Sequence, residues 1–357
     1  MIEIKLGKIT NIISEDKNTT IVEVKIGDEI NKAINYTNIT GIIKVDDYVI
    51  VNTTAVRLNL GTGGYHFIIS ILNNIEKEIS DTDGHIMKMR YTPQQIRCST
   101  LEEKSEYNKL FNKNISLKES IYAVGELHSM IEPLAASIKF KRPRVRICYI
   151  MTDGGALPIN FSNSVKRLKE KSLIDKTITI NHAFGGDYEC INIYSALIAA
   201  KEIVKADVTL IAMGPGIVGT NTKYGFSGIE QAYILDGIIK LGGNGICIPR
   251  ISFEDDRLRH IGISHHTITI LSEIVNNRVN VVIPMLDIDK NHIIEKQLKN
   301  NHLYDKHNIY HISGEGIEDV IKSFNITPTS MGKNFEQNKD YYYALNAVGN
   351  FICSNYL

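Results

Sequence analysis

The stretch VTLIAM, residues 208–213, is apolar or β-branched at every position and is followed directly by Gly214-Pro215-Gly216. A strand without polar alternation is buried on both faces, which is typical of the interior of a parallel sheet. A helix start follows at Ser227-Gly228-Ile229-Glu230, which fits the capping box, as Ser129-Met130-Ile131-Glu132 also does. The stretch therefore predicts one βα unit of a parallel α/β sheet.

The same pattern recurs on both sides of this stretch, at intervals of about thirty residues. The other predicted strands are 121–127, 145–151, 177–181, 245–251, 279–285 and 308–312. We expect a doubly wound, mostly parallel, Rossmann-like sheet, and a barrel of βα units is the alternative. Residues 341–357 are expected to form a final helix that packs on this domain or on another subunit, so a homo-oligomer is one expectation.

The first 72 residues carry a different pattern. Short runs rich in Ile, Val and Thr are separated by breaks at Gly27, Gly41 and Gly61, which predicts a small β-barrel-like domain. The polar stretch 73–83 is the expected linker. We therefore expect a barrel-like domain over residues 1–80 and an α/β domain over residues 84–357.

The composition argues against several classes of protein. The 357 residues include 40 Lys and Arg against 40 Asp and Glu, and 43% of them are hydrophobic. Zero net charge argues against a nucleic-acid partner or an anionic membrane surface, and no apolar run approaches the ~20 residues of a membrane span. The five cysteines form no C-x-x-C pair, and the N-terminus lacks a signal-peptide pattern, so we expect a cytoplasmic protein with reduced thiols.

Glycine, histidine and carboxylate residues gather where the predicted strands end. Ligands bind at this edge of a parallel sheet, because loops and helix N-termini converge there. Loops that only connect elements have no need for repeated glycine pairs beside ionisable side chains. We therefore expect a site for a small ligand at this edge.

The strand end near residue 181 has the densest combination of such residues. His182 is followed by Gly185, Gly186 and Asp187, and then by a predicted helix over residues 188–204. The backbone N–H groups of this turn could bind an anion, and His182 with Asp187 could ligate a metal or exchange protons. The alternative is that Asp187 caps the helix and the two glycines form a tight turn.

Two other strand ends carry the same kinds of residue. Asp153-Gly154-Gly155 precedes a predicted helix near residues 162–171, and capping or turn formation is the alternative role for Asp153. Glu126 and His128 lie two apart at a strand end, so we expect their side chains to point the same way. Such a pair suits metal ligation or acid–base chemistry, and a structural pair is the alternative.

Ser264-His265-His266-Thr267 is expected to begin another helix, whose macrodipole would keep His265 neutral. Neighbouring residues point in different directions on a helix, so we expect only one of the two histidines to reach the site. Four cationic or titratable residues upstream could clamp an anionic substrate: Arg250, Arg257, Arg259 and His260. The run 254–257 itself is expected to be a solvated loop.

Gly214, Gly216 and Gly219 fit G-x-G-x-x-G and are followed by Thr220. In a dinucleotide fingerprint the pyrophosphate meets the N-terminus of the next helix, but here the predicted helix begins only at Ser227. We therefore expect a glycine-rich ligand loop of another kind, and a nicotinamide-dependent oxidoreductase is an alternative.

Segments along nearly the whole chain carry a resemblance to a known family: 51–56, 61–66, 84–88, 126–130, 151–158, 182–187, 213–220, 249–253 and 264–267. Through them the chain resembles a bacterial domain-of-unknown-function family, number 3866. The family name implies no reaction, cofactor or catalytic residue. Two of the segments contain His66 and His85, which could border the same cleft and so place the ligand between the domains.

The leading hypothesis is an enzyme, a hydrolase or transferase, that acts on a small anionic or phosphorylated substrate. Catalysis is assigned to His182, Asp187, Asp153, Glu126, His128 and His265. Ligand binding is assigned to Gly154, Gly155, Gly185, Gly186, Gly214, Gly216, Gly219, Thr220, Arg250, Ser264, His266, His85 and His66. The sequence specifies no cofactor, although a divalent metal could assist. The competing hypothesis is a non-catalytic ligand-binding or regulatory protein that uses the same site.

Overall fold

The computed structural model describes residues 1–73, 75–76 and 84–357. The chain forms two compact units, Met1–Arg97 (unit 1) and Cys98–Leu357 (unit 2). Residues 84–97, which the sequence analysis grouped with the α/β domain, therefore belong to unit 1. Most of the expected linker over residues 73–83 lies outside the described residues.

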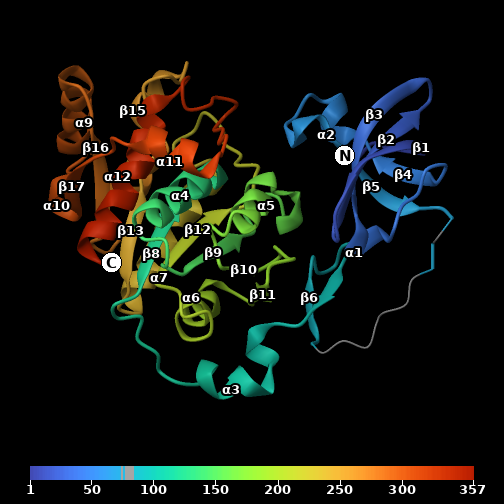
Figure 1. Cartoon of the computed structure of the whole chain (residues 1–357), viewed down its shortest axis with the longest axis horizontal. Helices are drawn as coiled ribbons and strands as arrows, with labels where there is room; N and C mark the ends of the chain where they lie inside the picture. The colour runs from blue at the N-terminus through green and yellow to red at the C-terminus, as the bar shows by residue number, and fades with distance from the viewer. Residues whose placement is uncertain (74, 77–83) are drawn as a thin grey trace. The chain divides into compact units, whose positions relative to one another are not determined.

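Unit 1 is built on a closed barrel in the strand order β1-β2-β3-β5-β4 (Figure 1). Its strands are β1 Ile4–Glu15, β2 Thr19–Ile26, β3 Glu29–Tyr36, β4 Tyr48–Asn52 and β5 His66–Ile71, with short helices α1 Thr37–Thr40 and α2 Thr54–Arg57. Alternate side chains point inward, so Val22, Val24, Val49 and Val51 share one buried cluster. The small barrel expected from the sequence is confirmed. A separate pair of strands, β6 Ile86–Lys88 and β7 Ile96–Cys98, follows it.

Unit 2 contains an eight-stranded sheet in the order β11-β10-β9-β12-β8-β13-β16-β17, in which all neighbouring strands are parallel. The strands are β8 Ile121–Gly125, β9 Ile147–Thr152, β10 Lys176–Thr179, β11 Tyr188–Glu189, β12 Val208–Met213, β13 Asn244–Ile248, β16 Asn280–Met285 and β17 Asn308–Ser313. The expected parallel sheet is confirmed, and its open strand order excludes the barrel of βα units.

Helices cover both faces of this sheet (Figure 1). One face is covered by α4 Ile131–Lys141, α5 Asn163–Glu170, α11 Ile317–Phe324 and α12 Lys339–Asn355. The other is covered by α6 Ile193–Glu202, α7 Glu230–Lys240 and α9 Ile288–Asn300. Helix α12 is the final helix expected from the sequence, and its buried side chains pack within unit 2 against α4 and β16.

The chain leaves the neighbouring strands β8 and β12 toward opposite faces of the sheet. Helix α4 follows β8 on one face, and α7 follows β12 on the other. Adjacent strands whose connections diverge in this way open a crevice at their carboxyl ends, which is where open α/β sheets bind ligands. The topology therefore places the candidate site at the carboxyl ends of β12, β8 and β13, which are neighbours in that order in the sheet.

Both capping boxes expected from the sequence are wrong. Helix α4 begins at Ile131 without a side-chain cap, and Ser129 Oγ instead contacts the hydroxyl groups of Ser330 and Tyr341. Glu230 begins α7, but its carboxylate accepts a hydrogen bond from Thr152 of β9. Tertiary partners have replaced the local backbone partners that a capping box requires.

The helix expected over residues 188–204 also begins later than predicted. Tyr188–Glu189 forms the short strand β11, and α6 begins at Ile193. Asn192 Oδ1 accepts a hydrogen bond from Ser195 N at 3.1 Å, so Asn192 is the N-cap. Within the described residues, no helix is both long and apolar enough to cross a membrane.

Candidate functional site

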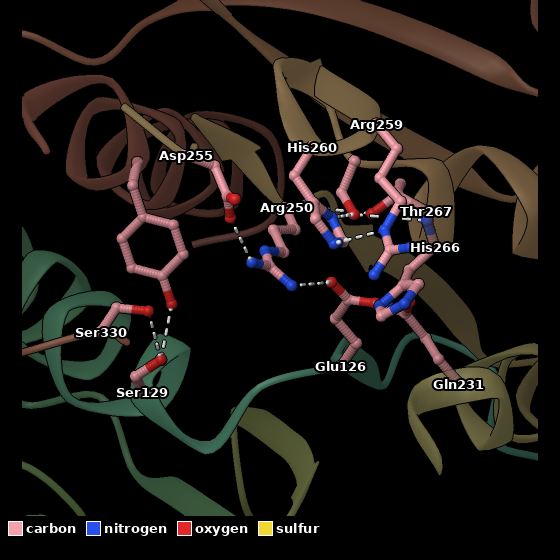
Figure 2. A network of polar contacts seen from close by, with 12 residues as sticks. Glu126, Ser129, Gln231, Arg250, Asp255, Arg259, His260, His266, Thr267 and Ser330 are labelled. Atoms are coloured by element: carbon pink, nitrogen blue, oxygen red, sulfur yellow. Dashed lines mark hydrogen bonds and ion pairs between the residues drawn. The ribbon is translucent and has the colours of Figure 1, made fainter. Parts of the chain in front are cut away.

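Three neighbouring strands deliver the residues of the candidate site. Glu126 follows β8, Gly214 follows β12 and Arg250 comes shortly after β13. Beyond Arg250 the chain forms a short antiparallel hairpin, β14 Ile251–Ser252 with β15 Gly262–Ile263, and then helix α8, His265–Thr269. This hairpin returns the chain to Glu126, so that His260 and His266 lie near it (Figure 2).

Two hydrogen bonds fasten the start of α8 to Arg250, shortly after β13. Ser264 N donates to Arg250 O at 2.8 Å, and Arg250 N donates to Thr267 Oγ1 at 3.0 Å. Ser264 Oγ accepts from His266 N, which makes Ser264 the N-cap of α8, and it also lies 2.8 Å from His260 Nδ1. The predicted start of this helix is confirmed, and its cap holds the histidines in place.

Glu126 is the buried charge at the centre of this arrangement. Glu126 is 0% exposed. Its carboxylate oxygen Oε2 lies 3.3 Å from His266 Nδ1, and the other oxygen, Oε1, lies 3.9 Å from Arg250 Nη1. Among the described residues, neither carboxylate oxygen has a hydrogen-bond partner. A buried carboxylate without hydrogen bonds is costly in free energy, so Glu126 is a strong candidate for a functional role.

Arg250 lies between Glu126 and Asp255 (Figure 2), and its Nη2 donates to Asp255 at 3.1 Å. Asp255 also accepts from Arg257 Nε at 2.9 Å. Burial raises the pKa of Asp255, but the hydrogen bonds from Arg257 outweigh burial and hold this pKa well below its usual range. The solvated loop expected here is therefore wrong for Asp255, whose side chain is 12% exposed.

A pocket of about 280 Å³ opens at Arg250. Its lining carries three cations and three carboxylates together with neutral groups: Arg250, Arg257, Lys333, Glu254, Asp255, Asp256, Ser252, Ser330, Met331, Asn338 and Tyr341. Asn338 and Tyr341 precede or begin the C-terminal helix α12, far from any glycine-rich or histidine motif, and sequence reasoning missed them as site residues. Only the folded chain brings them to the end of β13.

Three histidines come together beside Glu126. One ring nitrogen from each of His260, His265 and His266 lies within 4.8 Å of the other two. Both histidines of α8 reach the cluster, so the expectation that only one does is wrong. The first turn of α8 places His265 and His266 around His260, with ring centroids 4.9 and 5.1 Å from that of His260. Burial lowers the pKa of His260 to about 3 and that of His265 to about 4.

Asp153 and His182 lie in a second group at the ends of β9 and β10. Asp153 accepts from Asn181 Nδ2 and from the backbone N–H of His182, both at 3.3 Å. Glu230 faces the same strand end, and burial raises its pKa to about 7. From the sequence, Glu230 was expected only as a capping residue, because its burial depends on partners distant in the chain.

His128 does not point the same way as Glu126, contrary to expectation. Its Nδ1 lies 3.0 Å from Tyr149 Oη, and its Nε2 lies 2.6 Å from Oγ of Ser162, the N-cap of α5. Burial lowers the pKa of His128 to about 4. Strand β8 ends at Gly125, so the alternation of an extended chain no longer applies to residues 126–128.

Asp187 lies apart from His182. It is level with Thr177 at the beginning of β10, whereas His182 follows the end of that strand. Its carboxylate accepts hydrogen bonds from Lys169 Nζ at 2.7 Å and from Thr177 N at 2.8 Å. The partners of Asp187 are therefore those of a structural ion pair.

The turn at Gly185-Gly186 binds an anion from the chain itself. Gly185 N donates to a carboxylate oxygen of Glu189 at 2.7 Å, and Gly186 N donates to Thr179 Oγ1 at 3.1 Å. The backbone donors expected to bind an external anion are thus used by residues of β10 and β11.

Glycines at the ends of β9 and β12 allow two loops to touch. A Cβ on Gly155 would overlap the carbonyl oxygen of Gly214, and Ala156 N donates to Pro215 O at 2.7 Å. Gly154 lies against Glu230, and Gly216 has a φ of 114°, which favours glycine. These glycines therefore have structural roles in the packing of the two loops.

The rest of this loop forms a hairpin. Thr220 N donates to Gly225 O at 2.7 Å, and Gly219 pairs with Phe226. Because α7 begins only at Glu230, the loop does not lead into a helix N-terminus as a dinucleotide fingerprint does.

The two remaining ligand candidates, His66 and His85, belong to unit 1. His66 is the first residue of β5 and is buried, and burial lowers its pKa. His85 directly precedes β6.

A family model described as a protein of unknown function (DUF3866) matches residues 32–349. The matched range includes Glu126, Arg250 and the three clustered histidines. No curated protein matches the chain.

Proposed function

The chain belongs to the family of proteins of unknown function DUF3866. From the chemistry of its site we propose that it is an enzyme, a hydrolase or transferase, that acts on a small anionic substrate bound beside Arg250. The observation that carries the proposal is the position of Arg250. This buried cation lines a pocket on one side and faces the Glu126–His266 pair on the other.

Arg250 has donors to spare for an anion. Its side chain is 6% exposed, and the one hydrogen bond that its guanidinium makes within the described residues goes to Asp255. The 3.9 Å between Nη1 and Glu126 exceeds a hydrogen bond. A guanidinium carries five N–H donors in a fork that matches carboxylate and phosphate oxygens. These features support an anionic ligand.

The pocket favours a small and polar ligand. Its volume of about 280 Å³ lies at the lower end of the range for small-molecule sites. Ser252 and Asn338, which are hydrogen-bonded to each other at 2.9 Å, add neutral polar groups to the lining. A metabolite-sized anion fits such a pocket better than a dinucleotide does.

The Glu126–His266 pair supports catalysis by proton transfer. A carboxylate in contact with an imidazole can orient that ring and can support its exchange of a proton with water or with a substrate hydroxyl group. Arg250 contacts the same carboxylate, so an anion held by Arg250 would lie near the pair. Because the Gly214–Gly219 loop is part of a hairpin, the geometry favours hydrolysis or group transfer over nicotinamide chemistry.

The proposal is tested with inorganic phosphate, small carboxylates and phosphomonoesters as probes. We expect saturable binding by calorimetry and release of phosphate or carboxylate from at least one ester in the panel. Arg250→Met should weaken anion binding by roughly 10- to 150-fold, because a charge-assisted hydrogen bond contributes about 1.5–3 kcal/mol. Arg250→Lys, which keeps the charge but loses the fork, should bind with intermediate affinity.

Arg144→Met is the matched control, because Arg144 is exposed and precedes β9, at the opposite edge of the sheet. Its binding and turnover should equal those of the wild type. Equal anion affinity in a folded Arg250→Met variant would contradict the proposal. Saturable binding without turnover of any ester would favour the non-catalytic alternative.

A further inference from the structure

His260, His265 and His266 are grouped more closely than their positions in the chain require. His260 ends the 3₁₀ turn Leu258–His260, whereas the other two begin α8. The ring centroids of His265 and His266 are 4.4 Å apart. Phe226 fixes the ring of His266 by stacking on it, with centroids 3.9 Å apart and planes inclined by 3°.

Packing alone does not account for this cluster. His265 Nε2, His266 Nδ1 and both carboxylate oxygens of Glu126 are buried and lack a hydrogen-bond partner among the described residues. A buried polar atom without a partner lowers the stability of the folded chain unless a ligand or a proton satisfies it. His266 Nδ1 and Glu126 Oε2 face each other at 3.3 Å, so His265 Nε2 is the buried ring nitrogen that no described neighbour satisfies, and it is the atom that points to an external ligand.

The hydrogen bonds and contacts of the three rings indicate which nitrogen of each histidine could bind a metal. His260 Nδ1 is occupied by Ser264 Oγ, so the candidate ligand atom is Nε2, which accepts a hydrogen bond from Arg259 Nε at 3.4 Å. His266 Nδ1 faces Glu126 Oε2, which leaves its Nε2, and a Cβ on Gly219 would lie only 3.8 Å from that atom. His265 contributes the unpartnered Nε2.

The contact between Glu126 and His266 has the form of an outer-shell pair. A carboxylate that receives the second N–H of a metal-bound histidine fixes the tautomer and makes the metal-binding nitrogen more basic. Glu126 also supplies negative charge beside a bound cation. Three cations in the described part of the chain lie nearby. Arg250 and Arg257 are both paired with Asp255, and Arg259 Nη1 donates to Asn221 at 2.6 Å. A metal ion on His260 Nε2 would replace the hydrogen bond that Arg259 Nε donates to that nitrogen at 3.4 Å.

We propose that His260, His265 and His266 bind one divalent transition-metal ion through their imidazole nitrogens, with Glu126 as the residue that positions His266. Three histidine nitrogens are one of the ligand sets of catalytic zinc sites, in which the fourth position is open to water or substrate. Imidazole ligands select zinc and its first-row neighbours over magnesium and calcium. Ligand nitrogens around zinc lie about 3.3 Å apart, so metal binding would bring the three nitrogens, now within 4.8 Å of one another, closer together.

The site is tested on the full chain after removal of metal with a chelator. Titration with Zn²⁺ should give one ion per chain with an affinity at or below the micromolar range. Co²⁺ should give the visible absorption of a four- or five-coordinate nitrogen site, and Mg²⁺ should not compete. A wild-type chain without saturable Zn²⁺ binding, or with a Co²⁺ spectrum like that of the hexaaqua ion, would overturn the proposal.

Variants assign the ligands. His260→Ala, His265→Ala and His266→Ala should each weaken Zn²⁺ binding by more than the roughly 10- to 100-fold typical of an outer-shell change, and Glu126→Gln should fall within that range. His292→Ala is the control, because His292 lies on the exposed part of α9 and should bind as the wild type does. Far-UV circular dichroism confirms folding, and an unchanged affinity in all three folded histidine variants would reject the ligand set.

The metal site shares Glu126 and His266 with the proposed catalytic pair but does not use Arg250. With a metal bound, His266 would serve as a ligand rather than as the proton carrier, and anion binding and metal binding can fail separately. A folded Arg250→Met variant should keep one Zn²⁺ ion per chain while losing phosphate affinity. The triple histidine variant should lose Zn²⁺ and still bind phosphate. Loss of Zn²⁺ affinity in Arg250→Met together with an unchanged affinity in the triple variant would overturn the assignment of the metal to the histidines.

Discussion

Glu230 shows how a single buried side chain makes the stability of the protein depend on pH. Its carboxylate accepts a hydrogen bond from Thr152, and burial raises its pKa from 4.5 to about 7. Between these two pH values the unfolded chain has released the proton and the folded chain still holds it. The free energy of unfolding therefore falls as the pH rises from about 4.5 to about 7, and this contribution is constant above that interval.

Glu230→Gln should remove this dependence, because the amide resembles the protonated acid and its oxygen can still accept from Thr152. Relative to the wild type, the variant should gain roughly 2–3 kcal/mol of stability between pH 5 and pH 8. Urea unfolding at several pH values measures the difference. Glu336→Gln, at an exposed carboxylate, should show a flat difference over the same range. Parallel curves for wild type and Glu230→Gln would contradict the prediction.

At the scale of secondary-structure elements, the loops that follow β9 and β12 depend on the absence of one side chain. Gly155 brings its Cα against the peptide group of Gly214, where a Cβ would lie 2.8 Å from the carbonyl carbon and closer still to its oxygen. Backbone cannot move aside as a flexible side chain can. Gly154, one residue earlier, would place its Cβ 3.2 Å from the ends of the Glu230 and Met213 side chains.

Gly155→Ala should therefore destabilise unit 2 by at least about 2–3 kcal/mol, whereas Gly154→Ala should cost about 1 kcal/mol or less. The two variants add the same methyl group to adjacent residues, so each controls for the other. Denaturant unfolding gives both values. Equal effects from the two substitutions would show that the loops can separate without loss of stability.

The same elements show what local sequence can and cannot predict. Strand β12 was placed correctly because a run buried on both faces is apolar throughout, and this property is local. Strand β11 was missed because its two residues, Tyr188 and Glu189, have no such pattern and are paired by a neighbouring strand. Ser162 was a readable helix start, whereas Ser129 looked equally good and is used by Ser330 and Tyr341 instead. A capping residue is recognisable only when no distant partner competes for its side chain.

The candidate site likewise has a part that local sequence predicts and a part that only the folded chain determines. The concentration of histidine, glycine and acidic residues at strand ends is a property of the sequence, and it pointed to Glu126, Arg250, His265 and His266. Which of these residues meet depends on strand order, because β8 and β13 become neighbours only when the sheet forms. His182 and Asp187 are five residues apart in the chain, yet they lie at opposite ends of the short strand β10. Proximity in sequence was a poor guide to proximity in the site.

At the scale of the whole molecule, each unit has a core of its own. The buried cluster of unit 1 comes from residues between Ile9 and Ile71. The two clusters of unit 2 lie on opposite faces of its sheet and come entirely from residues after Cys98. A region that contains its complete apolar core can fold by itself. Glu126, Arg250 and the three histidines all belong to unit 2.

A fragment spanning residues 98–357 should therefore fold cooperatively and bind one Zn²⁺ ion with the affinity of the full chain. The reason is that the fragment retains both apolar clusters, one on each face of the sheet. These clusters include the α12 side chains that pack on α4. Far-UV circular dichroism during urea unfolding and metal analysis after dialysis provide the two measurements. The same fragment with His265→Ala supplies the baseline for nonspecific zinc. A fragment that shows no cooperative unfolding transition would contradict the independence of the core. A folded fragment that binds no more zinc than the His265→Ala fragment would contradict the placement of the metal ligands within unit 2.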